Sequence, residues 1–450
     1  MIGVNILFIV VAGVAFLGFI INALFDKIRI TKVMPLMIIG LLIGPILHLV
    51  PTGATSTVAA LTPFITAIAV AFILFDVGLN TNIYRLNKVI KKATEFTFLL
   101  AVATGLAIAG MAFAFLHWNI IECLIFGFAL SGPSSIIVPT LMKFVNASPE
   151  MKTALVYESV ITDILQLVIP LLLFNILANT GFTMSGAAIF LLEVVVGSVI
   201  FGSVAAMSWL YILNRFREYS KTYTWMLTIT MVIATYGIAQ SFSLSGALTV
   251  FVFGLLFSNL GGIIIMTENS TKDSPKDNFK RAFNELMKRY FYFENTKYVK
   301  DYQHEIEFFT STFFFVYIGM LVDIRGSNIP MLALIGAAVI VVVMTLRRLF
   351  SPMLDEYMSG TDEKRVKGIV YSNVARGMSP AIIATLPLAL GIIIPNFLNE
   401  MFAVILFSNI ASTIGIAYSY RGSADTSKKA EAEDKVKKTS SLNTNTSLSS

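Results

Sequence analysis

The feature that most constrains this chain is a series of long apolar runs separated by polar gaps. A helix needs about 20 largely apolar residues to cross the hydrocarbon core of a bilayer, and thirteen stretches approach that length. They are residues 4–25, 33–50, 57–78, 94–116, 120–143, 153–177, 185–212, 223–242, 245–261, 306–323, 329–350, 367–394 and 398–419. The sequence therefore predicts an all-α polytopic membrane protein with thirteen transmembrane helices.

The composition agrees with that class. Apolar residues make up 56% of the chain and charged residues only 13%, against about 25% charged in ordinary soluble proteins. One cysteine, Cys123, excludes an intrachain disulfide. The sequence contains no glycine-rich phosphate loop ending in Lys-Ser/Thr, no nucleophile elbow and no histidine–carboxylate cluster. We therefore predict neither an enzyme nor a cofactor.

The positions of the basic residues predict the orientation. Lysine and arginine crowd the cytoplasmic loops of membrane proteins, and with thirteen helices they fall into alternate gaps of this sequence. Of the 33 basic residues, only Arg325 and Arg376 depart from the alternation. We expect a cell-membrane protein with its N-terminus outside and its C-terminus in the cytoplasm. The net charge of +6 is then an orientation signal, so membrane lipid and not nucleic acid is the expected partner.

Two hydrophilic regions complete the predicted organisation. Residues 262–305 form a charged cytoplasmic loop, part of which either lies on the membrane surface or is a solvated regulatory segment. Residues 420–450 are rich in Ser, Thr, Lys and Asn, a composition typical of a disordered tail. Helices 1–9 then occupy residues 1–261, and helices 10–13 occupy residues 306–419.

The sixth run carries the main candidate for an ion site. Asp163 lies about 15 Å from the cytoplasmic end, near the middle of a core about 30 Å thick. Desolvation there favours the protonated form of an isolated carboxyl group, which suits a proton carrier. Ser159 lies one turn earlier and adds an oxygen for a small hard cation such as Na+. An acid within the membrane is a functional-site hypothesis by default; the alternative is a neutral acid bonded to a helix backbone.

A second acid in the same run is expected to have a different role. Glu158 and Asp163 are five residues apart, so they point in different directions and do not share one proton. Arg376 lies about 14 Å into the twelfth run, at a similar depth, and is the expected partner of Glu158. A buried ion pair is costly to break on one side. A structural role and a transport role remain equally open for this pair.

Other charged residues lie at or near the ends of runs. Asp76 ends the third run at the cytoplasmic boundary, where it is either an interfacial acid or an acid at the mouth of a cytoplasmic funnel. Arg347 and Arg348 end the eleventh run, where basic side chains commonly reach toward the interface. Glu193 lies about eight residues into the seventh run, and the sequence gives no reason for its presence there.

Glycine and proline interrupt two of the runs. The fifth contains Ser131-Gly132-Pro133-Ser134-Ser135, and the twelfth contains Arg376-Gly377-Met378-Ser379-Pro380. Such residues break helical hydrogen bonds, and the freed backbone must line a cavity or be buried in protein. The two runs are seven helices apart and have opposite directions. They predict inverted repeats whose broken helices cross at mid-membrane, although a simple proline kink explains either interruption alone.

Six motifs in chain order resemble those of the monovalent cation:proton antiporter superfamily, in particular its electroneutral sodium/proton exchanger branch. They are Gly40-Leu41-Leu42-Ile43-Gly44-Pro45, Phe75-Asp76-Val77-Gly78-Leu79-Asn80, Glu158-Ser159-Val160-Ile161-Thr162-Asp163, Ser245-Gly246-Ala247-Leu248 with Gly254-Leu255, Phe313-Phe314-Phe315-Val316-Tyr317-Ile318-Gly319-Met320, and Arg376-Gly377 with Pro380-Ala381. The resemblance implies a homodimer of two-domain protomers. Helices 4–6 (94–177) and 11–13 (329–419) would form a moving core, and the others a dimerisation domain.

The resemblance also implies roles for individual residues. Asp163 would bind the cation and the proton alternately, with help from Ser159. Asp76 would stand near the cytoplasmic access route and reach the ion directly or through water. Glu158 and Arg376 would brace the site as an ion pair.

Two positions depart from the pattern of that branch. Thr162 stands where the branch usually has Asn, and Ser131-Gly132-Pro133 stands where it usually has Thr-Asp-Pro. A side-chain ligand is therefore missing at Gly132, although Ser131 still offers oxygens, so Na+ is expected at Asp163, Ser159 and Ser131. Thr162 cannot ionise, and one carrier carboxylate argues for one cation per proton.

The sequence thus predicts a secondary antiporter that exchanges Na+, and also Li+, for H+ without net charge movement. Cation and proton would compete at Asp163 during alternating access. Exchange of K+ for H+ remains an alternative because of Gly132. A non-transporting membrane sensor, with residues 262–305 and the tail docking partners, is an alternative from another class, and the intact Asp163 speaks against it.

Overall fold

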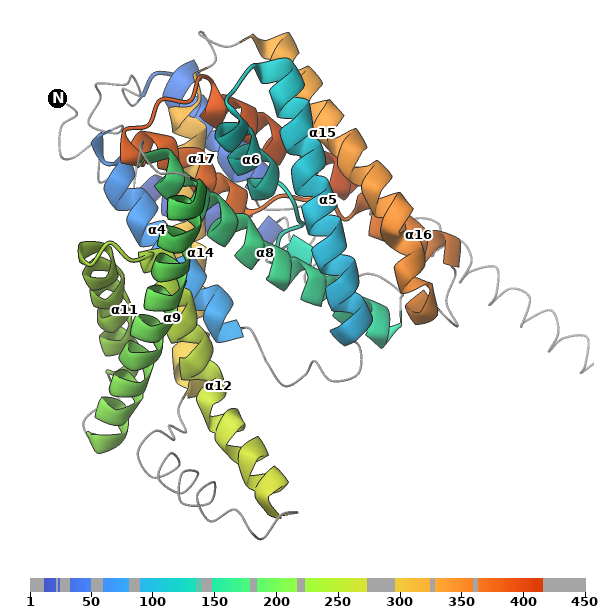
Figure 1. Ribbon diagram of the computed structural model, residues 1–450. Coiled ribbons are helices and arrows are strands. Elements are labelled where there is room, and N and C mark those ends of the chain that lie inside the picture. Colours follow the sequence, from blue (N-terminus) through green and yellow to red (C-terminus); the bar gives the residue numbers. More distant parts are fainter. Residues whose placement is uncertain are drawn as a thin grey trace, which may run out of the picture.

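The computed structural model describes residues 12–21, 23–24, 33–49, 60–80, 90–135, 137–138, 148–178, 184–216, 223–272, 296–323, 328–358 and 363–415. Throughout these ranges the chain forms helices and their connections, without a strand (Figure 1). The prediction of an all-α protein is therefore confirmed. The predicted tail and residues 273–295 of the charged loop lie outside the described ranges.

The helices follow the apolar runs closely. In chain order they are Ala12–Ile21, α2 (Val33–Leu41), the π-helical turn η1 (Leu42–Ile46), α4 (Thr62–Asn80), α5 (Ile90–Leu116), α6 (Ile120–Ala129), α8 (Pro149–Ala178), α9 (Met184–Arg215), α11 (Thr224–Ser241), α12 (Gly246–Lys272), α14 (Thr296–Leu321), α15 (Ile329–Phe350), the 3-10 helix η2 (Ser351–Met358), α16 (Glu363–Ser372), α17 (Met378–Leu390) and Phe397–Gly415. α15 coincides with its predicted run, whereas α12 and α14 extend into the charged loop.

Six of the described helices are long and apolar enough to cross a membrane. They are Thr62–Asn80, Lys92–Leu116, Glu150–Leu177, Leu192–Arg215, Ile329–Tyr357 and Phe397–Gly415. Shorter apolar helices accompany them, and two of these, α6 and α17, adjoin the interruptions that glycine and proline predict. The chain is therefore a multi-pass membrane protein.

The helices α4, α12, α2 and α14 approach one another through glycines. A Cβ atom added at Gly78 would lie 2.4 Å from the Phe251 carbonyl oxygen, and one at Gly254 would lie 2.5 Å from the Phe75 carbonyl oxygen. Without a lipid-phase hydrophobic force between helices, such small residues allow the backbone contact that holds helices together. Gly319 on α14 and Gly40 on α2 meet in the same way: their added Cβ atoms would lie 2.2 Å from the Met37 carbonyl oxygen and 2.0 Å from the Val316 carbonyl oxygen. Four of the six sequence motifs therefore have a packing role.

The described helices gather in two groups (Figure 1). α9, α11 and α12 lie together on one side, and α5, α15 and α16 lie on the other. α4 packs against α12 and α14 and also against α17. The hydroxyl groups of Thr66 on α4 and Thr385 on α17 are 3.0 Å apart and hydrogen-bonded. α4 is therefore in direct contact with one of the two interrupted segments.

Candidate functional site

The interruption of the fifth run begins where α6 ends. Asn119 and Glu122 cap the first turn of α6 reciprocally, with the Ile121 amide donating to Asn119 Oδ1 at 2.9 Å and the Asn119 amide donating to Glu122. The helix then ends at Ala129, because Gly132 and Pro133 follow within four residues and proline cannot donate a helical hydrogen bond.

The interruption of the twelfth run has the same form. α16 ends at Ser372, residues 373–377 are not helical, and α17 begins at Met378. The two interruptions contact each other, since the Ser134 amide donates to the Ala375 carbonyl at 3.0 Å. A Cβ atom at Gly377 would lie 2.1 Å from Ser134 Oγ, so only glycine permits this approach without a shift. We call residues 131–135 and 373–377 the crossing.

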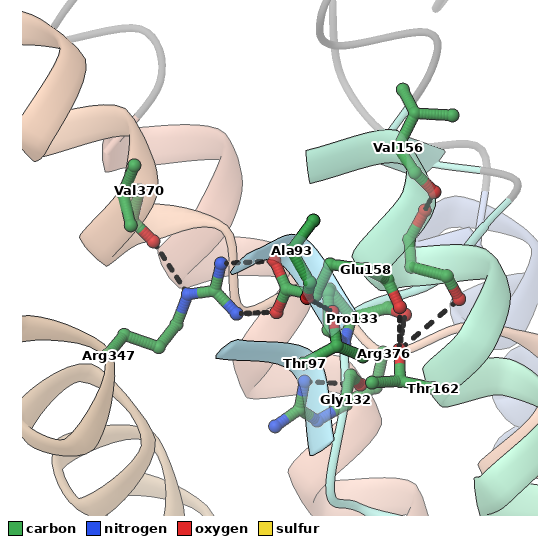
Figure 2. Close-up of polar contacts among 11 residues, drawn as sticks. Ala93, Thr97, Gly132, Pro133, Val156, Glu158, Thr162, Arg347, Val370 and Arg376 are labelled. Carbon is green, nitrogen blue, oxygen red and sulfur yellow. Dashed lines mark hydrogen bonds and ion pairs between the residues drawn. The ribbon is translucent and has the colours of Figure 1, made fainter. Parts of the chain in front are cut away.

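Side chains from neighbouring helices bind the backbone groups that the crossing frees. Arg376 donates from Nη1 to the Gly132 carbonyl (Figure 2). Its own carbonyl accepts from Asn409 Nδ2 at 2.7 Å. The Arg376 amide donates to Ser408 Oγ at 3.2 Å. Buried backbone groups without a partner are costly in a membrane, so these bonds stabilise the non-helical conformation.

Asp163 on α8 lies at the crossing and is 3% exposed. Its Oδ2 accepts from the Ser135 amide at 2.7 Å, and its Oδ1 accepts from Ser379 Oγ at 2.8 Å. Ser135 belongs to the first interrupted segment and Ser379 to the first turn of α17. Both broken helices therefore supply hydrogen-bond donors to the same carboxyl group, and the Ser135 side chain adds a further hydrogen bond.

Ser135 and Ser379 were not among the ion-binding residues predicted from the sequence. Both lie inside the two Gly-Pro interruptions, 131–135 and 376–380. A hydroxyl group beside glycine and proline, as at Ser379, was the sequence feature that could have predicted a ligand there. The two predicted ligands are placed differently. Ser159 Oγ donates to the Val156 carbonyl of its own helix at 2.8 Å. Ser131 Oγ is buried and has no hydrogen-bond partner among the described residues.

The predicted pairing of Glu158 with Arg376 is wrong. Arg347 holds Glu158 through two bonds, Nη1 to Oε1 at 2.5 Å and Nη2 to Oε2 at 3.0 Å, and both side chains are 1% exposed (Figure 2). Arg347 Nε donates to the Val370 carbonyl of α16 at 2.6 Å. The guanidinium is thus turned inward by α16, which folds back beside α15, and does not reach toward the interface as expected.

Arg376 is buried at the crossing, and no two-bond ion pair like that of Arg347 with Glu158 is described for it. It is 1% exposed, and its Nε and Nη2 make no hydrogen bond within the part of the chain that the structure describes. Figure 2 shows its guanidinium beside Gly132, apart from the Glu158–Arg347 pair. Arg376 therefore contributes a positive charge close to Asp163 and fixes the first interrupted segment.

The two departures from the family pattern are in contact. A Cβ atom at Gly132 would lie 2.1 Å from Thr162 Cβ. Thr162 Oγ1 donates to the Glu158 carbonyl at 2.9 Å and approaches the Pro133 carbonyl at 3.4 Å. The threonine therefore fills the space in which a side chain at position 132 would stand. Gly132 and Thr162 form one packing unit.

The remaining candidates lie outside the crossing. Asp76 lies inside α4, four residues before its end at Asn80, so the prediction that it ends the helix is wrong. Glu193 is on the exposed side of α9. Pro380 is buried in the first turn of α17. Across the described ranges, no group of three or more His, Cys, Asp or Glu side chains is placed to hold a metal ion, so cation ligands would come from one carboxylate with hydroxyl and carbonyl oxygens.

The chain matches one protein family over most of its length. Residues 12–418 match the family described as sodium/hydrogen exchanger, transmembrane. The chain is also 24% identical over 298 residues to the Na(+)/H(+) antiporter NhaP of Pseudomonas aeruginosa. That match covers 62% of this chain and 63% of the relative, so the chain spans a little under two thirds of the length of this curated relative.

Solved structures of an archaeal antiporter share the fold. The sodium proton antiporter MjNhaP1 of Methanocaldococcus jannaschii at pH 8 superposes with a TM-score of 0.69 at 17% identity, over 94% of this chain and 100% of that chain. A structure of MjNhaP1 from an electron-microscopy map gives a TM-score of 0.64 at 18% identity, over 94% and 97% of the two chains. At this identity the likeness establishes the fold.

Proposed function

The chain belongs to the sodium/hydrogen exchanger family, and on that premise we propose that it is a secondary antiporter that exchanges Na+ for H+ across the cell membrane. Membership confirms the resemblance carried by the six motifs and the prediction of a transporter and not an enzyme. The observation that carries the proposed activity is the position of Asp163, buried at the crossing with donors from both broken helices.

The proposed mechanism is competition at one carboxyl group. Donors at both oxygens stabilise the ionised form of Asp163, which attracts a small cation from the cytoplasm when protons are scarce. Acid conditions load the proton and release the cation. Because both broken helices touch Asp163, its load affects the geometry of both. Li+ is the expected second substrate, since it is also a small hard cation.

The charges near Asp163 support one cation per proton. Glu158 is neutralised by Arg347, and Thr162 cannot ionise. Arg376 adds a positive charge that stays the same whether Asp163 binds Na+ or H+. Asp163 is then the one carboxyl group of this cluster that binds Na+ in one state and H+ in the other. Each direction of transport therefore moves one positive charge, and the exchange is electroneutral.

We propose the following parts for the other candidates. Ser159 and Ser131 provide further oxygens for Na+, and Asp76 stands near the cytoplasmic access route. The supporting residues hold the crossing in place; they are Thr162, Gly132, Pro133, Gly377 and Pro380. Glu158 braces the site with Arg347 as its partner.

The proposed architecture keeps the thirteen spans and their inverted repeats, with the N-terminus outside. Residues 94–177 and 329–419 form the core, and the other helices form the dimerisation domain of a homodimer. The contacts that hold the site support this core, because Glu158, Arg347, Asp163 and Ser379 all lie within these two ranges.

The test is sodium-dependent proton movement in everted membrane vesicles. Asp163→Asn removes the ionisable group and should abolish exchange. Asp355→Asn is the matched control, because Asp355 is an exposed carboxylate beside Lys367, and should exchange like the wild type. Normal exchange by Asp163→Asn would overturn the site. A clear dependence of the initial rate on imposed voltage would overturn the one-for-one stoichiometry.

Exchange of K+ for H+ is the second candidate, because Gly132 offers no side-chain oxygen. Replacing Na+ with K+ in the same vesicles separates the two. Equal or faster proton movement with K+ would favour the second candidate.

A further inference from the structure

We propose that the Ser379 hydroxyl is a direct ligand of the transported cation and supplies the oxygen that Gly132 lacks. The inference rests on the proposed antiport and adds a specificity-determining residue to its site. Ser379 lies outside the set of residues that the sequence motifs assign to ion binding, and its position at Asp163 comes only from the way the two broken helices cross.

The geometry places the hydroxyl where a ligand must be. Ser379 Oγ is 2.8 Å from Asp163 Oδ1, and Ser379 is 2% exposed. It is the second residue of α17 and lies two positions after the N-cap residue Gly377, so a short rigid connection links it to the crossing. A cation bound at Oδ1 therefore has the Ser379 oxygen within reach without a change of backbone conformation.

A hydroxyl group can interact with Asp163 both when it is protonated and when it binds a cation. A serine hydroxyl has one donor and two acceptor lone pairs, and its hydrogen rotates freely. It donates to the ionised carboxylate, accepts from the protonated acid, and turns a lone pair toward a bound cation. Ser379 can thus remain in contact with Asp163 throughout the cycle.

Two other hydroxyls on α8 are already bonded to backbone carbonyls of their own helix. Ser159 Oγ is bonded to the Val156 carbonyl, and Thr162 Oγ1 is bonded to the Glu158 carbonyl. Hydroxyl oxygens are needed because a hard cation such as Na+ prefers oxygen ligands, and Asp163 alone provides two. Two serine side chains, Ser135 and Ser379, hydrogen-bond that carboxylate, and of these Ser379 comes from the segment opposite to Gly132.

The charged groups around Asp163 fix the direction of the expected pH effect. Arg376 faces it from the crossing, and Glu158, from its own helix, is bound to Arg347. Removing the Ser379 hydroxyl leaves these charges in place and takes one donor from the ionised carboxylate. The protonated form is then relatively favoured, so Na+ displaces the proton only at higher pH.

The test compares Ser379→Thr with Ser379→Val in proteoliposomes. The two side chains have nearly the same shape and differ in the hydroxyl group. We expect Ser379→Thr to keep an apparent KM for Na+ and Li+ close to that of the wild type. Ser379→Val should raise both by about tenfold, the usual order for loss of one hydrogen bond to a charged group, and should move the rate profile to higher pH.

Ser372→Ala is the control for the loss of a buried serine in the same segment. Its hydroxyl donates to the Gly368 carbonyl of its own helix at 2.8 Å, and its KM and pH profile should match the wild type. Protection of each purified variant by Na+ against thermal unfolding gives a second readout, because a ligand that binds the folded state raises its stability.

The outcomes separate the two proposals. If the wild type exchanges Na+ and Asp163→Asn does not, but Ser379→Val and Ser379→Thr have equal KM values, pH profiles and protection by Na+, the Ser379 inference is overturned alone. If the wild type shows no cation-dependent proton movement, or Asp163→Asn retains it, the proposed function fails first.

Discussion

The glycine contacts between α4, α12, α2 and α14 and the crossing at Asp163 are both close backbone approaches, yet different interactions stabilise them. In the first region, Gly78, Gly254 and Gly319 bring intact helices together through close backbone contact. In the second, Gly377 brings the two non-helical segments together, Gly132 brings the first of them against α8, and side-chain hydrogen bonds hold the freed backbone. Glycine in a motif therefore marks the packing of intact helices in one place and the proposed ion site in the other, and the neighbouring polar groups distinguish the two.

The largest expected effect concerns the ion pair behind the crossing. Glu158→Gln or Arg347→Met alone leaves one buried charge without its partner, which should destabilise the folded protein by about 3–5 kcal/mol. The double variant Glu158→Gln/Arg347→Met should recover most of that loss in thermal unfolding. Glu158→Gln/Arg376→Met should not, and recovery by that pair in place of the first would restore the pairing expected from the sequence.

The next effect tests the packing of intact helices. Gly319→Ala places a Cβ atom 2.2 Å from the Met37 carbonyl oxygen, a backbone contact that no rotamer change relieves. We expect a loss of about 3 kcal/mol, the upper end for overpacking, with an unchanged KM for Na+ in the protein that folds. Gly110→Ala is the control, because nothing lies within 4 Å of its added Cβ; a gain of about 0.5–1 kcal/mol is usual for this change inside a helix.

The same substitution in the crossing should change function as well as stability. Gly132→Ala would meet Thr162 Cβ at 2.1 Å, and we expect a loss of about 1–3 kcal/mol together with a raised KM for Na+, because Asp163 follows Thr162 directly. Adding Thr162→Gly should cost less than the sum of the single changes. Strict additivity in unfolding and KM would argue that the two residues do not form one unit.

The smallest effect concerns the link between α4 and α17. Thr66→Val removes the 3.0 Å hydrogen bond to Thr385 and should cost about 0.5–1.5 kcal/mol. Because this bond joins α4 to an interrupted segment, we expect a modest change in turnover with KM unaffected. Thr230→Val, at an exposed position of α11 whose hydroxyl bonds the Met226 carbonyl of its own helix, should leave turnover unchanged in the same proteoliposome assay.

Hydropathy was sufficient to predict the helices that the structure describes, and glycine with proline was sufficient to predict the two interruptions. Each apolar run is long enough to constrain one element, and glycine with proline can end a helix without any tertiary contact. The rise per residue predicted the same depth for Asp163 and for the two interruptions, and the structure brings them into contact.

The partners of the buried groups could not be predicted in this way. Depth gives the height of a residue in the membrane but not the direction in which it points. Glu158 therefore had Arg376 as its expected partner, whereas the return of α16 beside α15 turns Arg347 inward. Ser379 reaches Asp163 because Ser134 and Ala375 set the register of the crossing, a contact between residues more than 200 positions apart.

The contact between Gly132 and Thr162 has a consequence for how this site can change over generations and in engineering. Position 132 cannot gain a side chain while Thr162 and the backbone around it stay as they are, so a change at position 132 requires a change at position 162. If aspartate were introduced at position 132 alone, the measured effect would come from its steric conflict with Thr162 and not from a change of ion preference. Experiments that transplant selectivity between these proteins therefore need to exchange the helix and the crossing together.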